Sequence, residues 1–84
     1  MGDTVEVTWL DAWCDHDTTD GPQDWKDECR VKTYGTLVRA TDSVVSVAEE
    51  VVSYGSDSDS YRCVTHVPRG MVVPGGIVVL GRPA

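Results

Sequence analysis

Apolar and polar residues alternate near the start of the chain, where single polar residues separate Val5, Val7 and Trp9. A repeat of two residues is typical of a strand that buries one face. The pattern therefore predicts a strand over residues 4–11.

Further runs rich in valine, threonine and tyrosine have the composition of pleated strands. They cover residues 29–40, 44–52 and 61–67. Residues 77–80 are continuously apolar, which predicts a strand covered on both faces, either by the interior of a barrel or by a neighbouring subunit. Five short strands with little helix predict an all-β fold: a small, five-stranded, SH3-like or Sm-like antiparallel barrel. At 84 residues the chain makes a single domain, residues 1–84.

Turn residues separate the predicted strands. Residues 41–43 are short enough for a hairpin, residues 54–60 form a polar and flexible turn, and residues 67–72 form a brief turn before the last strand. Pro74-Gly75-Gly76 then interrupts the chain before the final apolar run.

Charge divides the chain into two unlike parts. The first 28 residues hold nine carboxylates and one lysine, whereas the other residues hold five carboxylates and six basic residues. Residues 12–28 read as a long acidic loop with one helical turn near residues 24–28. A loop of this length in so small a domain is more often functional than a mere connection.

Composition also limits the partners. A net charge of −7 argues against general nucleic-acid binding, which depends on lysine and arginine. We expect no membrane segment and no secretory signal. Three cysteines cannot all pair within one chain, which favours reduced thiols in a cytoplasm. Because so small a core leaves apolar surface near solvent, we expect a homo-oligomer.

A resemblance to known proteins covers most of the chain. The segments that carry it are Trp9-Leu10-Asp11-Ala12, Trp25, Thr33-x-Gly35-x-Leu37-Val38 and Val67-Pro68-Arg69-Gly70-x-Val72. The chain resembles a group of short, mostly uncharacterised proteins of tailed bacteriophages. The resemblance implies an accessory protein that acts in the cytoplasm of a bacterial host, and it implies no reaction.

The chain is also similar to Sm-like proteins, which place a Gly-x-Leu in a bent strand and an Arg-Gly before the last strand. The matching positions are Gly35, Leu37, Asp42, Arg69 and Gly70. It departs from that family by lacking an N-terminal helix, by having Ser43-Val44 where an RNA-contacting asparagine is expected, and by its negative charge. The similarity implies the small barrel, and the departures argue against RNA binding.

Two groups of side chains have the chemistry of metal ligands. Thiols and imidazoles suited to tetrahedral zinc occur at Cys14, His16, Cys29, Cys63 and His66. Carboxylates suited to Ca²⁺ or Mg²⁺ occur at Asp11, Asp15, Asp17 and Asp20. Neither set has the regular spacing of a known metal motif, so we expect incidental thiols, a solvated acidic loop and no cofactor.

Catalysis is not expected. A thiolate needs a base and an oxyanion site nearby, and neither Cys14 with His16 nor Cys63 with His66 is followed by a recognisable element of that kind.

Ligand binding is the leading hypothesis. Tryptophans in a polar loop either fasten the loop to the core or offer a flat face to a ligand, and arginines supply donors for phosphate. The candidate residues are Asp11, Trp13, Trp25, Arg39 and Arg69. Together they suggest a sponge that sequesters a small nucleotide-like immune signal at a subunit interface.

Two alternatives stay open. In the first, the acidic loop, with Asp15, Asp17 and Asp20, blocks a basic surface of a host protein. In the second, the domain is a small structural component of a larger particle.

Overall fold

The computed structural model describes residues 2–12, 21–24, 28–53 and 59–83. In this part of the chain, five β-strands form one antiparallel sheet, which confirms the all-β expectation. The elements are β1 (Thr4–Asp11), η1 (Pro22–Asp24), β2 (Cys29–Ala40), β3 (Val44–Ser53), β4 (Asp59–Pro68), η2 (Arg69–Met71) and β5 (Val72–Gly81). Both η elements are single 3-10 turns, and the described residues contain no helix long and apolar enough to cross a membrane.

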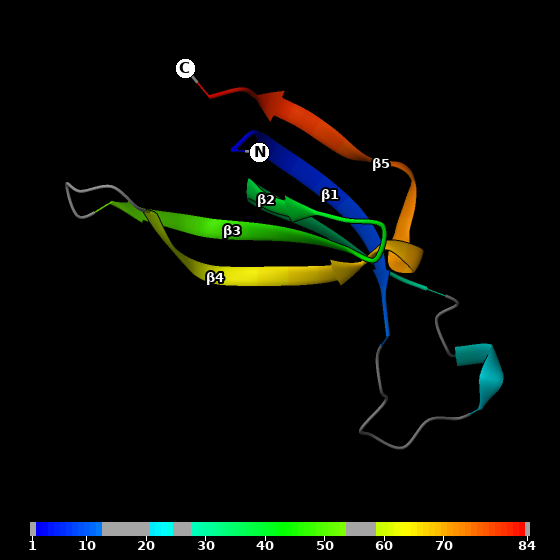
Figure 1. The fold of residues 1–84 in the computed structure, drawn as a ribbon. Coiled ribbons are helices and arrows are strands. Elements are labelled where there is room, and N and C mark those ends of the chain that lie inside the picture. Colours follow the sequence, from blue (N-terminus) through cyan, green and yellow to red (C-terminus); the bar gives the residue numbers. More distant parts are fainter. Residues whose placement is uncertain (1, 13–20, 25–27, 54–58, 84) are drawn as a thin grey trace.

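The sheet is open, with the strand order β4-β3-β2-β1-β5 (Figure 1). The expected closed barrel is therefore wrong, because β4 and β5 are the two edges and no pairing joins them among the described residues. A closed barrel needs an interior filled with side chains. The buried apolar side chains of the described residues are small: Val5, Val7, Val45, Val47, Ala48 and Val67.

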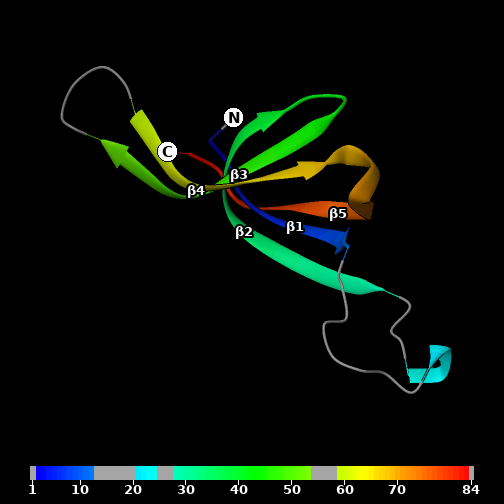
Figure 2. The same ribbon diagram turned by 90° about the horizontal axis from the view of Figure 1, so that it is seen from below.

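Strand β2 bends between two partners. Its first part pairs with β1 from Cys29 to Thr36, and its second part pairs with β3 from Thr36 to Ala40. Figure 2 shows this long strand crossing from β1 to β3. At Gly35 the two strands approach so closely that a Cβ atom would collide with the carbonyl oxygen of Ala48, so only glycine fits at the bend.

The hairpin of β3 and β4 extends beyond the rest of the sheet (Figure 1). Residues 49–53 pair only with β4 among the described strands, because the pairing of β3 with β2 ends at Ala48. Strand β4 begins at Asp59, so the predicted flexible turn at residues 54–60 is too long at its end, and residues 54–58 lie outside the described part. Cys63 has a positive φ of 55° and interrupts the regular pairing of the hairpin.

A 3-10 turn of the acidic segment spans Pro22–Asp24. It overlaps the helical turn predicted at residues 24–28 only at Asp24, and residues 25–27 lie outside the described part. Proline favours the first position of a helical turn, because its ring fixes φ and its missing N–H needs no partner there.

Strand β5 is less covered than its apolar sequence suggests. Ile77 packs against the core, whereas Val78, Val79 and Leu80 keep 45%, 42% and 56% of their surface exposed. The expectation that a barrel interior covers residues 77–80 is therefore wrong, because β5 lies at an open edge.

Candidate functional site

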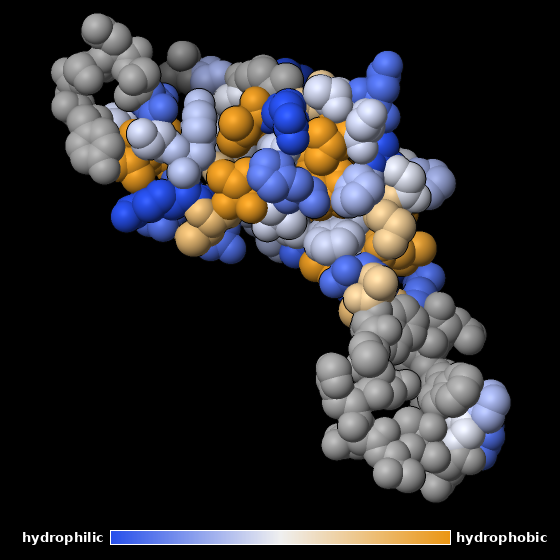
Figure 3. Space-filling view, turned by 60° about the horizontal axis from the view of Figure 1, so that its bottom comes forward, coloured by the Kyte–Doolittle hydropathy of each residue, from blue (hydrophilic) through white to orange (hydrophobic). Residues whose placement is uncertain are grey.

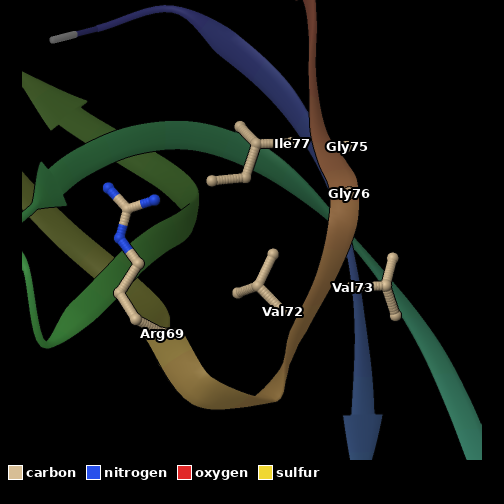
Figure 4. A pocket seen from close by; sticks show the side chains of 6 residues that line it. All are labelled: Arg69, Val72, Val73, Gly75, Gly76 and Ile77. Carbon is tan, nitrogen blue, oxygen red and sulfur yellow. The ribbon is translucent and has the colours of Figure 1, made fainter.

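The pocket found in the described residues lies between η2 and the first half of β5. It has a volume of about 270 Å³ and is open to solvent. Its lining consists of Arg69, Val72, Val73, Gly75, Gly76 and Ile77. Figure 4 shows Arg69, Val72 and Ile77 on the inner side of this curved segment. The pocket therefore combines one cationic side chain with aliphatic walls.

Arg69 is held at the pocket by the turn at residues 41–43. Its Nε donates to the carbonyl oxygen of Thr41 at 2.8 Å, and its backbone N–H donates to the carbonyl oxygen of Ser43 at 2.9 Å. Within the described part of the chain, no carboxylate forms an ion pair with Arg69. A guanidinium carries five N–H donors in a fixed fork, so those of its terminal nitrogens suit the oxygens of an anion.

The far wall of the pocket is a wide bulge in β5. Trp9 pairs with Val72 and Val7 pairs with Ile77, so residues 73–76 stand opposite Thr8 alone. Gly75 has a φ of +69°, and a Cβ on Gly76 would lie 2.6 Å from the carbonyl oxygen of Thr8. Pro74-Gly75-Gly76 thus makes a bulge inside one strand, which pushes the chain outward and opens the pocket.

A second polar arrangement crosses three strands. Ser46 of β3 has its Oγ 2.7 Å from Nδ1 of His66 on β4, and Nε of Arg39 on β2 donates to the same oxygen at 3.4 Å. Neighbours Val45 and Val47 belong to the core, so these side chains lie on the opposite face of the sheet. Ser46 is only 1% exposed, so its hydroxyl is covered and orients the other two side chains.

Of the predicted ligand-binding residues, the structure places only Arg69 at the pocket. Arg39 belongs to the polar arrangement with Ser46, on another part of the sheet. Asp11 is exposed at the end of β1, opposite Cys29, where its Oδ1 accepts the N–H of Ala12 at 2.9 Å. Trp13 and Trp25 lie outside the described residues.

The remaining candidates are only partly placed. The residues Asp15, Asp17, Asp20, Cys14 and His16 lie outside the described part of the chain. Among the described residues, no group of three or more histidine, cysteine, aspartate or glutamate side chains could hold a metal ion. Cys63 is an exposed free thiol on β4, Cys29 is a half-buried free thiol at the start of β2, and the Nδ1 of His66 contacts Ser46.

Sequence reasoning missed Ser46 and the bulge. The signal for the bulge was present, because proline followed by two glycines is typical of a strand irregularity. No sequence signal pointed to Ser46, since its contacts depend on the register of three strands.

Comparisons with protein-family models, with curated proteins and with solved structures gave no match. The chemistry of the site is thus the ground for a functional proposal.

Proposed function

We propose that the protein is a non-catalytic binding protein that holds a small phosphate-bearing ligand in the pocket between η2 and β5. The observation that carries the proposal is the Arg69 guanidinium, held by the Thr41 carbonyl oxygen at the mouth of a pocket with aliphatic walls. Arginine matches the planar, two-pronged geometry of phosphate oxygens. Val72 and Ile77 suit an apolar or ring-shaped group attached to that phosphate.

The size of the pocket limits the ligand. Ligand pockets in proteins usually have volumes of about 300 to 1,000 Å³, and this one has about 270 Å³. It suits a phosphate with part of a nucleoside, and a larger ligand would extend past its open mouth. A second subunit would then supply the missing wall, as expected for a ligand held at a subunit interface.

The biological context of the proposal comes from resemblance. The likeness to short phage proteins supports a phage-encoded protein that acts in the cytoplasm of a bacterial host, where it sequesters a nucleotide-like immune signal. Two features support an SH3-like or Sm-like relationship for the open sheet: the bend of β2 at Gly35, and the Arg69-Gly70 pair directly before β5.

Isothermal titration calorimetry with inorganic phosphate, adenosine monophosphate and a cyclic dinucleotide tests this function. We expect binding of at least one nucleotide, weakened at least tenfold by Arg69→Gln, because the substitution removes the cationic fork and its charge. Arg62→Gln is the matched control, since Arg62 is an exposed arginine that pairs with Glu50 at 3.1 Å on the β3–β4 hairpin. Equal affinities of the two variants, or no binding of any probe, would contradict the proposal.

An acidic interaction module is the second candidate, and the excess of carboxylates in the first 28 residues favours it. In that case the triple substitution of Asp15, Asp17 and Asp20 by asparagine abolishes capture of a basic host protein, whereas Arg69→Gln has no effect. A purely structural component of a larger particle would tolerate both changes.

A further inference from the structure

The second half of β5 presents an unprotected strand edge. β5 pairs only with β1 among the described strands, so the backbone groups on its other side have no strand partner there. Residues 77–81 contain no charged side chain and no proline. Val78, Val79 and Leu80 are exposed on this edge. Strand edges of this kind recruit a further strand.

The opposite edge of the sheet carries the usual protection. β4 contains Asp59, Arg62 and a final Pro68, and the positive φ of Cys63 interrupts its regular course. Charges, proline and local irregularity all hinder the addition of a strand. On the face of the molecule that Figure 3 shows, hydrophilic and hydrophobic side chains are mixed. The contrast singles out β5.

We infer that residues 77–81 of β5 pair antiparallel with the same residues of a second copy of this chain, about a twofold axis at Val79. The free stretch is bounded by the bulge at residues 73–76 on one side and by Arg82-Pro83 on the other. Pairing the whole stretch with itself places Val79 opposite its own copy and Val78 opposite Leu80 of the partner subunit. A twofold interface of this kind closes on itself and gives a dimer.

A second copy is the occupant that the charge pattern of this edge allows. Two chains of net charge −7 repel each other, so they can meet only through a stretch without carboxylates, and residues 70–81 carry no charge. The neighbouring strand β1 carries a carboxylate, because Glu6 pairs with Val78. Oε1 of Glu6 lies 3.8 Å from Nζ of Lys32. The two copies of β1 would lie three strand spacings apart, about 14 Å, which exceeds the screening length of roughly 8 Å at physiological salt.

The interface is small, so the dimer is weak. A pairing of five residues lies at the low end of specific interfaces, so we expect a dimer that forms only at high protein concentration. The pairing does not depend on the ligand of the Arg69 pocket. Loss of the pairing would leave the binding of a phosphate by Arg69 intact, and loss of phosphate binding would leave the pairing intact.

Sedimentation velocity from about 10 to about 1,000 µM protein tests the pairing. We expect a monomer that becomes a dimer with rising concentration, and at least tenfold weaker association for Val78→Lys, because a lysine charges the free edge. Val51→Lys is the matched control, since Val51 is 42% exposed and lies on the β3–β4 hairpin. A monomer throughout, assemblies larger than a dimer, or equal loss in both variants would overturn the inference.

Disulfide trapping checks the symmetry with an independent variant. In a chain whose three cysteines are replaced by serine, Val79→Cys faces its own copy at a Cα separation of about 4.5 to 5.5 Å, which a disulfide can bridge. We expect a covalent dimer on mild oxidation for Val79→Cys and far less for Val51→Cys. Equal trapping at both positions would show random collision and would contradict the twofold pairing. Circular dichroism of each variant confirms that the sheet has formed.

Discussion

Gly35 lies where β2 turns from β1 to β3, and alanine at this position would test the bend directly. The new Cβ would collide with the carbonyl oxygen of Ala48 and would lie 2.9 Å from Cγ1 of Val47. Both neighbours belong to β3 and are buried, so neither can move into solvent. The collision involves backbone, and β2 and β3 would have to separate to relieve it.

The expected cost follows from two opposing effects. Forcing extra volume into a packed core costs about 1–3 kcal/mol, and a collision with backbone belongs at the upper end of that range. Replacing glycine also lowers the conformational entropy of the unfolded chain, which stabilises the folded state by about 0.4–1 kcal/mol. We therefore expect Gly35→Ala to lower the free energy of unfolding by about 2–2.5 kcal/mol. In a domain of this size that corresponds to a drop of roughly 10–20 °C in melting temperature.

Thermal unfolding followed by circular dichroism measures this change, and Gly70→Ala provides the control. No heavy atom lies within 4 Å of a Cβ built on Gly70, so its replacement should change stability by less than about 0.5 kcal/mol. If Gly35→Ala melted within about 3 °C of Gly70→Ala, the close approach of β2 and β3 would be refuted.

Two further predictions concern polar side chains on the sheet. Ser46→Ala removes the hydroxyl that contacts Nδ1 of His66, and it should lower the free energy of unfolding by about 0.5–1.5 kcal/mol. Urea unfolding measures this change. Ser53→Ala is the control on the exposed hairpin and should lower the free energy of unfolding by less. A hydrogen bond to the Glu6 carboxylate, together with its negative charge, raises the pKa of Tyr34 above its ordinary value of 10.0. The neutral phenol is thus favoured in the folded state. Its contribution to the free energy of unfolding is complete below pH 10 and is lost as the pH rises through the folded-state pKa. Urea unfolding above pH 10 should show a steeper loss of stability in the wild type than in Tyr34→Phe, and parallel curves would contradict this reading.

Local pattern predicted β1 to β4 well, because a half-buried strand must alternate, but it predicted β5 six residues too short. Two predicted strands, residues 4–11 and 29–40, have the bounds of β1 and β2. The β3–β4 hairpin was predicted one residue too short in β3 and two too short at the start of β4, because this distal part lies beyond the core and has no buried face to impose alternation. Strand β4 also ends one residue later than predicted, at Pro68. Strand β5 begins at Val72 rather than at residue 77, because Pro74-Gly75-Gly76 looks like a break between elements in the sequence but forms a bulge inside the strand.

Long-range features could not be predicted in the same way. Whether β4 and β5 pair to close a barrel depends on how much volume the core fills. The pattern of apolar residues within single strands does not show that volume. The contact of Arg39 with Ser46 depends on a register shift between Leu37 and Arg39, a single-residue effect that no composition rule reveals. Arg69 could be predicted as a ligand-binding candidate. The opposite wall of its pocket could not, because that wall is the bulge of residues 73–76, which depends on the register between β5 and β1.

Strand β5 carries both proposals, and the bulge is the reason it can. By leaving β1 at residues 73–76, the chain opens the pocket beside Arg69 and also ends the regular edge, so that pairing with a second copy begins at Ile77. Gly76 sits too close to the Thr8 carbonyl oxygen for any other residue, so its replacement would disturb both features at once. Arg69→Gln and Val78→Lys each touch one feature only. A variant pair that separates ligand affinity from self-association would therefore show that one strand serves two independent contacts.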